Sequence, residues 1–122
     1  MNMEALEVKK DSRGSLVEAF KLPTDGQLSY LIINPNETRG NHYHQRKTES
    51  FLVIYGAATM RVRDRKTGNV INTEVSGYQP ISITVSPDNT HSITATDEGA
   101  IVLLWCDEQY NKKDADTHPE EV

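Results

Sequence analysis

Turn-forming residues divide this chain into short segments, and most of these segments are too short for a core helix. Seven glycines and five prolines occur in 122 residues, and the stretches between them are rich in Val, Ile, Thr, Tyr and Phe. Such stretches, bounded by turns, are typical of β-strands. No segment sustains a helical apolar stripe over about ten residues. The sequence therefore predicts an all-β sandwich or barrel of about ten short strands.

The expected strands fall within one domain. A length of 122 residues suits a single domain over 1–122, with a core of about residues 5–106 and a short polar, acidic tail over 107–122. We expect Gly56 and Gly99 to separate neighbouring strands, and the tail to form one helical turn before running along the surface. The predicted strands span residues 6–8, 15–21, 28–34, 51–55, 57–64, 70–75, 81–85, 91–95 and 100–106.

Negative charge is concentrated in the tail, which holds six acidic residues and two lysines in a chain of net charge -5. The rest of the chain is nearly neutral, so nucleic acid is not an expected partner. No apolar run approaches the roughly eighteen residues of a membrane span, and the first residues lack a basic-then-apolar signal. We therefore expect no membrane partner and a cytoplasmic location. The one cysteine, Cys106, is expected to be a buried, inert thiol.

Histidines and a glutamate recur at a spacing that suits metal binding. On an extended strand, His42 and His44 point to the same face, since side chains alternate with a period of two. After a turn, Glu49 enters the next strand facing the same point, and His91 follows a turn far downstream. Imidazoles and a carboxylate are suitable ligands for a divalent transition metal. We expect zinc as the first choice, with iron, manganese or nickel as alternatives.

The spacing of these residues resembles the two-part metal motif of the cupins. The first part is His-x-His, four residues, Glu, six residues and Gly, which runs from His42 to Gly56. The second part is Pro-x-x-x-His, from Pro87 to His91. The resemblance implies a cupin jelly roll, or double-stranded β-helix, whose small barrel has room for one small ligand.

Two further stretches carry a narrower resemblance. Residues 11–20 read Asp-Ser-Arg-Gly-Ser-Leu-Val-Glu-Ala-Phe, and residues 38–42 read Thr-Arg-Gly-Asn-His. They resemble motifs of the dTDP-4-dehydrorhamnose 3,5-epimerases and of sugar 3,4-ketoisomerases. Nearly the whole chain is more similar to the C-terminal cupin domain of bifunctional capsular-polysaccharide enzymes. The matching stretches are residues 39–44, 47–51, 67–68, 75–77, 90–93 and 104–108, and the Asp116-Thr117 pair. This resemblance implies epimerisation at C3 of a UDP- or dTDP-linked 4-keto-6-deoxy sugar through an enolate, with a separate reductase acting downstream.

The resemblance also implies roles for individual residues. In the metal-free epimerases the first histidine of the Arg-Gly-x-His run is the base, which carries over to His42. Tyr55 or Tyr110 is a candidate for the acid that returns the proton. If His42 instead holds the metal, the metal polarises the 4-keto oxygen and another group acts as the base. The two mechanisms are rivals at one site.

Cationic residues around the motifs are candidates for binding the diphosphate of a nucleotide sugar. A planar guanidinium binds phosphate oxygens two at a time, which suits Arg13 and Arg39, and Lys47 adds a point charge. Arg61 joins them if its strand faces the pocket. Glu18 either orients a base or pairs with Arg13.

The sequence is also compatible with other functions. A sugar 3,4-ketoisomerase forms the same enolate but returns the proton to another carbon. A non-catalytic metal- or sugar-binding cupin module would lack a tyrosine facing the pocket. A small metal-dependent oxygenase would need iron and oxygen, and the cluster of arginines argues against it. A homodimer is the default expectation for a small enzyme of this kind.

Overall fold

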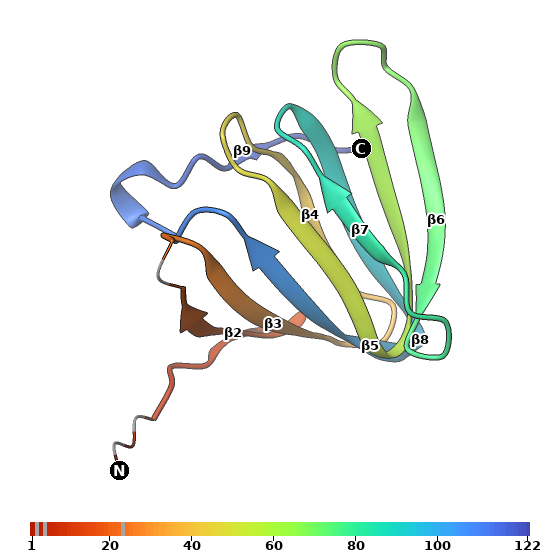
Figure 1. Ribbon diagram of the computed structural model, residues 1–122. Helices are drawn as coiled ribbons and strands as arrows, with labels where there is room; N and C mark the ends of the chain where they lie inside the picture. The colour runs from red at the N-terminus through yellow and green to blue at the C-terminus, as the bar shows by residue number, and fades with distance from the viewer. Residues whose placement is uncertain (2, 4, 23) are drawn as a thin grey trace.

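The computed structural model describes residues 1–122 apart from 2, 4 and 23, and these residues form an all-β molecule (Figure 1). The only helical element in this described part is η1 (Lys112–Asp114), one turn of 3-10 helix in the tail. The predicted all-β class is therefore confirmed. The strands are β1 (Lys9–Asp11), β2 (Gly14–Lys21), β3 (Gln27–Ile33), β4 (Thr38–Tyr43), β5 (Glu49–Asp64), β6 (Val70–Ser76), β7 (Ser82–Val85), β8 (Asn89–Cys106) and β9 (His118–Pro119).

Two long strands, β5 and β8, organise the curled antiparallel sheet (Figure 1). They pair with each other along most of their length, from Glu49 opposite Cys106 to Asp64 opposite Asn89. One half of β8 also pairs with β3, and the other half pairs with β4. In the same way, β5 pairs with β7 at its start and with β6 at its end. Each long strand thus serves two parts of the curled sheet.

The expectation that Gly56 and Gly99 separate strands is wrong, because both β5 and β8 continue through these glycines. Both residues have φ of 74°, a conformation that favours glycine. A Cβ on Gly56 would lie 2.0 Å from the carbonyl oxygen of Gly99, so the two strands approach too closely for any side chain there. The glycines bend the strands where the register shifts, and the sheet curls without a break.

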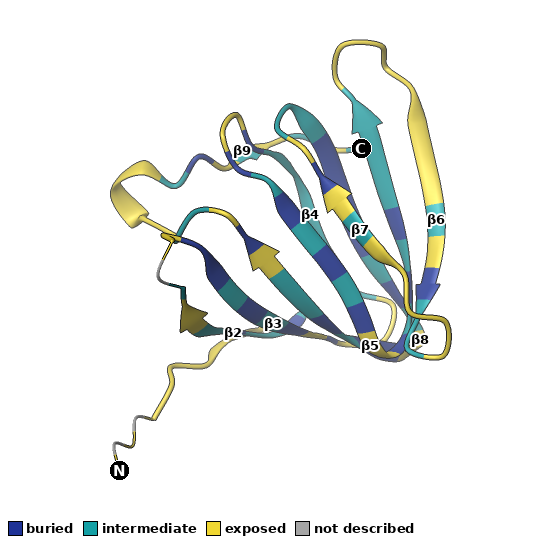
Figure 2. Cartoon of the chain, viewed as in Figure 1, coloured by how far each residue is buried: buried dark blue, intermediate teal, exposed yellow. Residues whose placement is uncertain are grey.

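Burial along β5 follows the curl of the sheet (Figure 2). Before the bend, the odd-numbered residues Glu49, Phe51 and Val53 are buried; beyond it, the even-numbered residues Ala58 and Met60 are buried. The bulge between Val53 and Tyr55 shifts the alternation by one residue. The side of the sheet on which a residue lies at one end of β5 therefore does not predict the side at the other end.

The core is a single apolar cluster on the inner face of the sheet. Ile33, Met60 and Val102 are almost completely buried in it. Burial of a side chain of this size contributes roughly 1.5–3 kcal/mol. The cluster fills one part of the interior, while polar side chains from β4, β5 and β8 occupy the remainder.

The two ends of the chain differ from expectation. The prediction of a strand over residues 6–8 is wrong, since the first strand starts at Lys9. This strand, β1, forms a hairpin with β2, in which Asp11 lies opposite Gly14. The tail does form one helical turn, but it then adds β9 to β4 instead of only running along the surface. No helix in the described part of the chain is long and apolar enough to cross a membrane.

Candidate metal centre and active site

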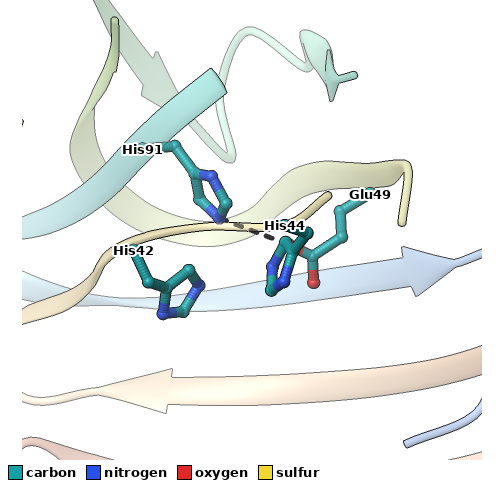
Figure 3. A group of neighbouring side chains, drawn as sticks. All are labelled: His42, His44, Glu49 and His91. Atoms are coloured by element: carbon teal, nitrogen blue, oxygen red, sulfur yellow. Dashed lines mark hydrogen bonds and ion pairs between the residues drawn. The ribbon is translucent and has the colours of Figure 1, made fainter. Parts of the chain in front are cut away.

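Three strands bring the expected metal ligands to one point (Figure 3). His42 lies near the end of β4, His44 directly follows that strand, and Glu49 is the first residue of β5. His91 lies on β8, directly opposite His42 in the β4–β8 pairing. One possible ligand atom from each of these residues lies within 4.8 Å of the others. The sheet therefore joins two motifs that are far apart in the sequence.

Within this group, His44, Glu49 and His91 form a tight, buried trio. The carboxylate Oε1 of Glu49 lies 2.8 Å from Nε2 of His44 and 3.2 Å from Nε2 of His91. Burial would raise the pKa of Glu49, but the two histidines hold it well below its ordinary value, so the group is an anion. The trio therefore places an anionic carboxylate between two imidazoles, an arrangement that suits a cation.

The protonation of the trio also suits a metal ion. Nε2 of His91 is buried and has no hydrogen-bond partner among the described residues, because its contact with Glu49 lacks hydrogen-bonding geometry. Burial would lower the pKa of His44, but the hydrogen bond and charge of Glu49 raise it overall. A metal ion would take the place of the proton between His44 and Glu49 and give the orphan nitrogen of His91 a partner. Two imidazoles and a carboxylate form a known zinc ligand set that keeps one position open.

His42 stands beside the trio and is less buried than its members (Figure 3). Its ring centroid lies 4.8 Å from those of His44 and His91. Burial, together with these two histidines, lowers the pKa of His42 to about 4. The imidazole is therefore neutral near pH 7, which is the form needed either to bind a metal or to accept a proton.

The four residues line a cavity of about 250 Å³. Most of the other expected site residues lie there too: Arg13, Glu18, Arg39, Lys47 and Tyr110. Nη1 of Arg39 is buried without a hydrogen-bond partner among the described residues, and its nearest carboxylate is Asp11 at 3.9 Å. Burial lowers the pKa of Arg39, although a guanidinium keeps its charge at neutral pH. The cavity thus contains a cationic group whose buried Nη1 has no hydrogen-bond partner among the described residues.

The expected pairing of Glu18 with Arg13 is not found in the structure. Glu18 pairs with Lys9, and Arg13 pairs with Asp11, so Glu18 does not pair with Arg13. Lys47 is only 5% exposed, and its Nζ donates a hydrogen bond of 2.8 Å to the carbonyl of Ala115 in the tail. Lys47 also lines the cavity, so its expected role in binding the substrate stays a prediction.

Tyr55 and Arg61 do not lie with the other residues. Tyr55 is 61% exposed, and Arg61 donates a hydrogen bond of 3.1 Å to Asn72; neither lines the cavity. An unbroken alternation from Glu49 would turn both odd-numbered residues inward, but the bulge after Val53 reverses the pattern. The expectations for Tyr55 as the acid and Arg61 as a substrate ligand are corrected for this reason. Of the two tyrosines, Tyr110 is the one in the cavity.

The tail supplies contacts that the sequence analysis did not predict. The backbone carbonyl of Asp116 lies 2.7 Å from Nδ1 of His44, and its carboxylate accepts hydrogen bonds from the loop after that histidine. Asp116 is 6% exposed, which is unusual for an aspartate in an acidic tail. The only local signal was the Asp116-Thr117 pair, which belongs to the matched stretches of the family resemblance.

Comparison with known proteins gives a consistent result. Residues 9–118 match the family model described as the polysaccharide biosynthesis C-terminal domain. The chain is 38% identical over 110 residues to a UDP-2-acetamido-2,6-beta-L-arabino-hexul-4-ose reductase of Pseudomonas aeruginosa, covering 88% of this chain and 29% of that protein. It is 33% identical to the capsular polysaccharide assembling protein CapF of Staphylococcus aureus, with a TM-score of 0.93, covering 98% of this chain and 33% of that one. The chain thus spans about a third of these relatives' length.

A more distant structural relative bears on the fold alone. An oxalate decarboxylase of Bacillus subtilis is 22% identical, with a TM-score of 0.77 over 93% of this chain and 30% of that one. The curled antiparallel sheet and these neighbours confirm the expected cupin jelly roll. With a matching model that spans nearly all of its strands, the chain belongs to the polysaccharide biosynthesis C-terminal domain family.

Proposed function

We propose that this chain is a nucleotide-sugar epimerase that acts at C3 of a UDP- or dTDP-linked 4-keto-6-deoxy sugar in polysaccharide precursor biosynthesis. The observation that carries the proposal is the position of a neutral histidine, His42, in the same cavity as the trio of His44, Glu49 and His91. The relatives named for capsular polysaccharide assembly and for a UDP-linked hexulose support a nucleotide-sugar substrate. A proton next to a ketone is acidic, and such a site is suited to remove it.

In this proposal, His44, Glu49 and His91 hold a divalent metal, with zinc as the first choice. When bound, the metal supplies Lewis-acid polarisation of the 4-keto oxygen. All four ligand atoms lie within 4.8 Å of one another, and we propose His42 as the base, not a fourth ligand, because it is the least buried of the four and its imidazole is neutral. The histidine's neutral ring nitrogen is then free to act as the base.

The reaction is a proton exchange without any net oxidation. A ring nitrogen of His42 takes the C3 proton, and the electron pair of the C–H bond moves into the carbonyl to form the enolate. The phenol of Tyr110 returns a proton to C3 from the opposite face, while the enolate collapses to the ketone. Lys47 places its ammonium in the same cavity, where a buried positive charge favours the developing oxyanion. Proton transfer then returns His42 and Tyr110 to their starting forms.

Arg39 and Arg13 are proposed to bind the diphosphate of the substrate. The buried Nη1 of Arg39 lacks a partner among the described residues, and a phosphate oxygen would supply one. Arg13 lines the same cavity, but it forms an ion pair with Asp11. Because the net charge of this pair is near zero, we assign Arg39 the larger share of diphosphate binding. A separate reductase is proposed to act on the epimerised ketone. A homodimer and a cytoplasmic location remain predictions.

Tyr110 also bears on the binding-module alternative. That alternative required all candidate tyrosines to face away from the pocket, and Tyr110 lines the cavity. Keto migration to C3 shares the enolate with epimerisation, so it is distinguished by its product and not by the residues of the site.

Solvent exchange tests the proposed reaction. The protein is incubated in heavy water with UDP- and dTDP-linked 4-keto-6-deoxy sugars, and the C3 proton is followed by NMR. We expect deuterium at C3 together with inverted couplings at that carbon. Carbonyl migration in place of inversion would identify a ketoisomerase, and the absence of exchange with both nucleotides would contradict enolate chemistry.

A further inference from the structure

We infer that Asp116 is a positioning residue of the metal centre, and that the C-terminal strap, residues 115–122, completes that centre from outside the ligand set. The inference rests on the proposed metal binding by the trio, but not on the proposed epimerase reaction. It is based on three sets of contacts between the strap and the strand and loop that carry the ligands.

The carboxylate of Asp116 holds the loop between two ligands. Oδ1 accepts a hydrogen bond of 2.9 Å from the backbone N–H of Gln45, and Oδ2 accepts one of 2.8 Å from Arg46. Both donors lie in the four-residue loop that joins His44 to Glu49. The side chain is only 1% exposed, so the two charge-assisted bonds are shielded from water. The carboxylate therefore fixes the shape of the loop that sets the distance between these ligands.

The backbone carbonyl of the same residue orients the ring of His44. It lies 2.7 Å from Nδ1, and since a carbonyl oxygen only accepts hydrogen bonds, Nδ1 carries the proton. The opposite ring nitrogen, Nε2, then faces Glu49 and the position of the metal. Partners of this kind behind a ligating histidine fix its tautomer and its direction.

The backbone of Asp116 is held in an unfavourable conformation. Its φ is 51°, in the left-handed region that non-glycine residues adopt only rarely. The hydrogen bonds to the loop compensate for this conformation, which links the carboxylate to the placement of the carbonyl in the same residue. Loss of the carboxylate would thus also release the carbonyl from His44.

The remainder of the strap is fastened to the ligand strand. β9 pairs with β4, with Pro119 opposite His42, and the backbone N–H of Glu120 donates a hydrogen bond of 2.9 Å to Asn41. On the other side of Asp116, the carbonyl of Ala115 accepts the bond from Lys47. The strap therefore contacts β4 and the loop on both sides of His44.

A matched pair of variants tests this role in the full chain. Asp116→Asn keeps the size of the side chain but removes its negative charge. An amide has only one oxygen that can accept a hydrogen bond, so its NH₂ group must face the second backbone N–H, and that hydrogen bond is lost. Asp114→Asn is the control: the same substitution two residues away, at a side chain that is 67% exposed and has a 3.3 Å ion pair with Arg46. Zinc affinity is measured by competition with a chromogenic chelator, and cobalt absorption reports the ligand geometry.

We expect Asp116→Asn to weaken zinc binding by about 10- to 100-fold and to alter the cobalt spectrum, as for other partners of metal ligands. Asp114→Asn should match the wild type in both. If Asp116→Asn lowers the melting temperatures of the metal-free and zinc-loaded proteins equally and leaves zinc affinity unchanged, the residue is only structural and the inference is overturned. A wild-type chain that binds no zinc would also overturn it. Tight zinc binding without C3 exchange would leave this inference standing and contradict only the epimerase.

Discussion

Gly40→Ala provides a sharp test of how the two ligand strands meet. Gly40 lies on β4 opposite Ser92 of β8, two residues before His42. Its φ is 98°, and an added Cβ would lie 2.7 Å from the carbonyl oxygen of His91 and 3.0 Å from Cα of Ser92. Both neighbours are backbone atoms of β8, so they yield only if the strands move apart. Such a movement would separate His42 from His91.

The expected cost has two parts. A non-glycine residue in a sparsely populated conformation costs roughly 1–3 kcal/mol. Overpacking against fixed neighbours typically adds about 1–3 kcal/mol. Reduced entropy of the unfolded chain returns about 0.4–1 kcal/mol for a Gly to Ala change. The net loss of unfolding free energy should thus be about 1–6 kcal/mol, a large fraction of the roughly 5–15 kcal/mol available to a domain.

Gly68→Ala is the matched control. Gly68 has φ of 79°, but an added Cβ would meet no atom of the described residues within 4 Å. It therefore carries the conformational cost without the collision, and we expect a loss near 1 kcal/mol, at the lower end of such costs. Unfolding in urea followed by circular dichroism measures both variants without metal, and chelator competition gives their zinc affinity. Equal destabilisation of the two variants, with equal zinc affinity, would refute the close approach of β4 to β8.

Three further predictions concern the cavity. Tyr110→Phe should slow C3 exchange by about 10²- to 10⁴-fold as expected for loss of a general acid, whereas Tyr55→Phe, outside the cavity, should not; equal rates would remove Tyr110 from the reaction. Arg39→Ala should raise KM for the nucleotide sugar by about 10- to 100-fold, as expected for the loss of a charge-assisted hydrogen bond. Arg61→Ala, outside the cavity, is the control, and an unchanged KM for Arg39→Ala would exclude Arg39 from phosphate binding. Burial raises the pKa of Cys106 to about 11, so its alkylation rate should rise with pH to a midpoint near that value, and a midpoint at the ordinary 9.0 would contradict its burial.

Three of the four clustered residues, His42, His44 and Glu49, were predictable from the sequence because they are close together along the chain. Period-two alternation places His42 and His44 on one face, and a short turn returns the chain to Glu49. His91 was predictable only through the family resemblance, since its partner strand lies far away in sequence. The pairing of β4 with β8 supplies the contact that the spacing alone does not determine.

The wrong placement of Tyr55 and Arg61 has one physical cause, which is that alternation holds only along an unbroken strand. A single bulge in β5 turned Tyr55 out of the cavity and left Arg61 on the opposite face from Met60. The two strands expected on either side of Gly56 are in fact one strand with a bend. Local composition gives no sign of this difference, because a glycine with positive φ serves a turn and a bulge equally well.

The tail shows the same limit at longer range. Its charged residues indicated a solvated segment, yet Asp116 is buried against a loop some 70 positions earlier, with sequence separations of 70 and 71 in its two bonds. The composition of a segment indicates its average solvent exposure, but it does not identify the one residue that tertiary contacts bury. The tail is mostly exposed, as its composition indicates, but tertiary contacts bury Asp116.

The assignment of His42 as a base beside a three-ligand metal centre is tested most directly by His42→Ala, with zinc content and C3 deuterium exchange measured on the same sample. We predict that the variant keeps one zinc per chain, held by His44, Glu49 and His91, and loses exchange by about 10²- to 10⁴-fold, the typical contribution of a general base. Exchange at the wild-type rate would contradict a catalytic role for His42. Loss of zinc together with exchange would show that His42 is a ligand and that another group removes the proton.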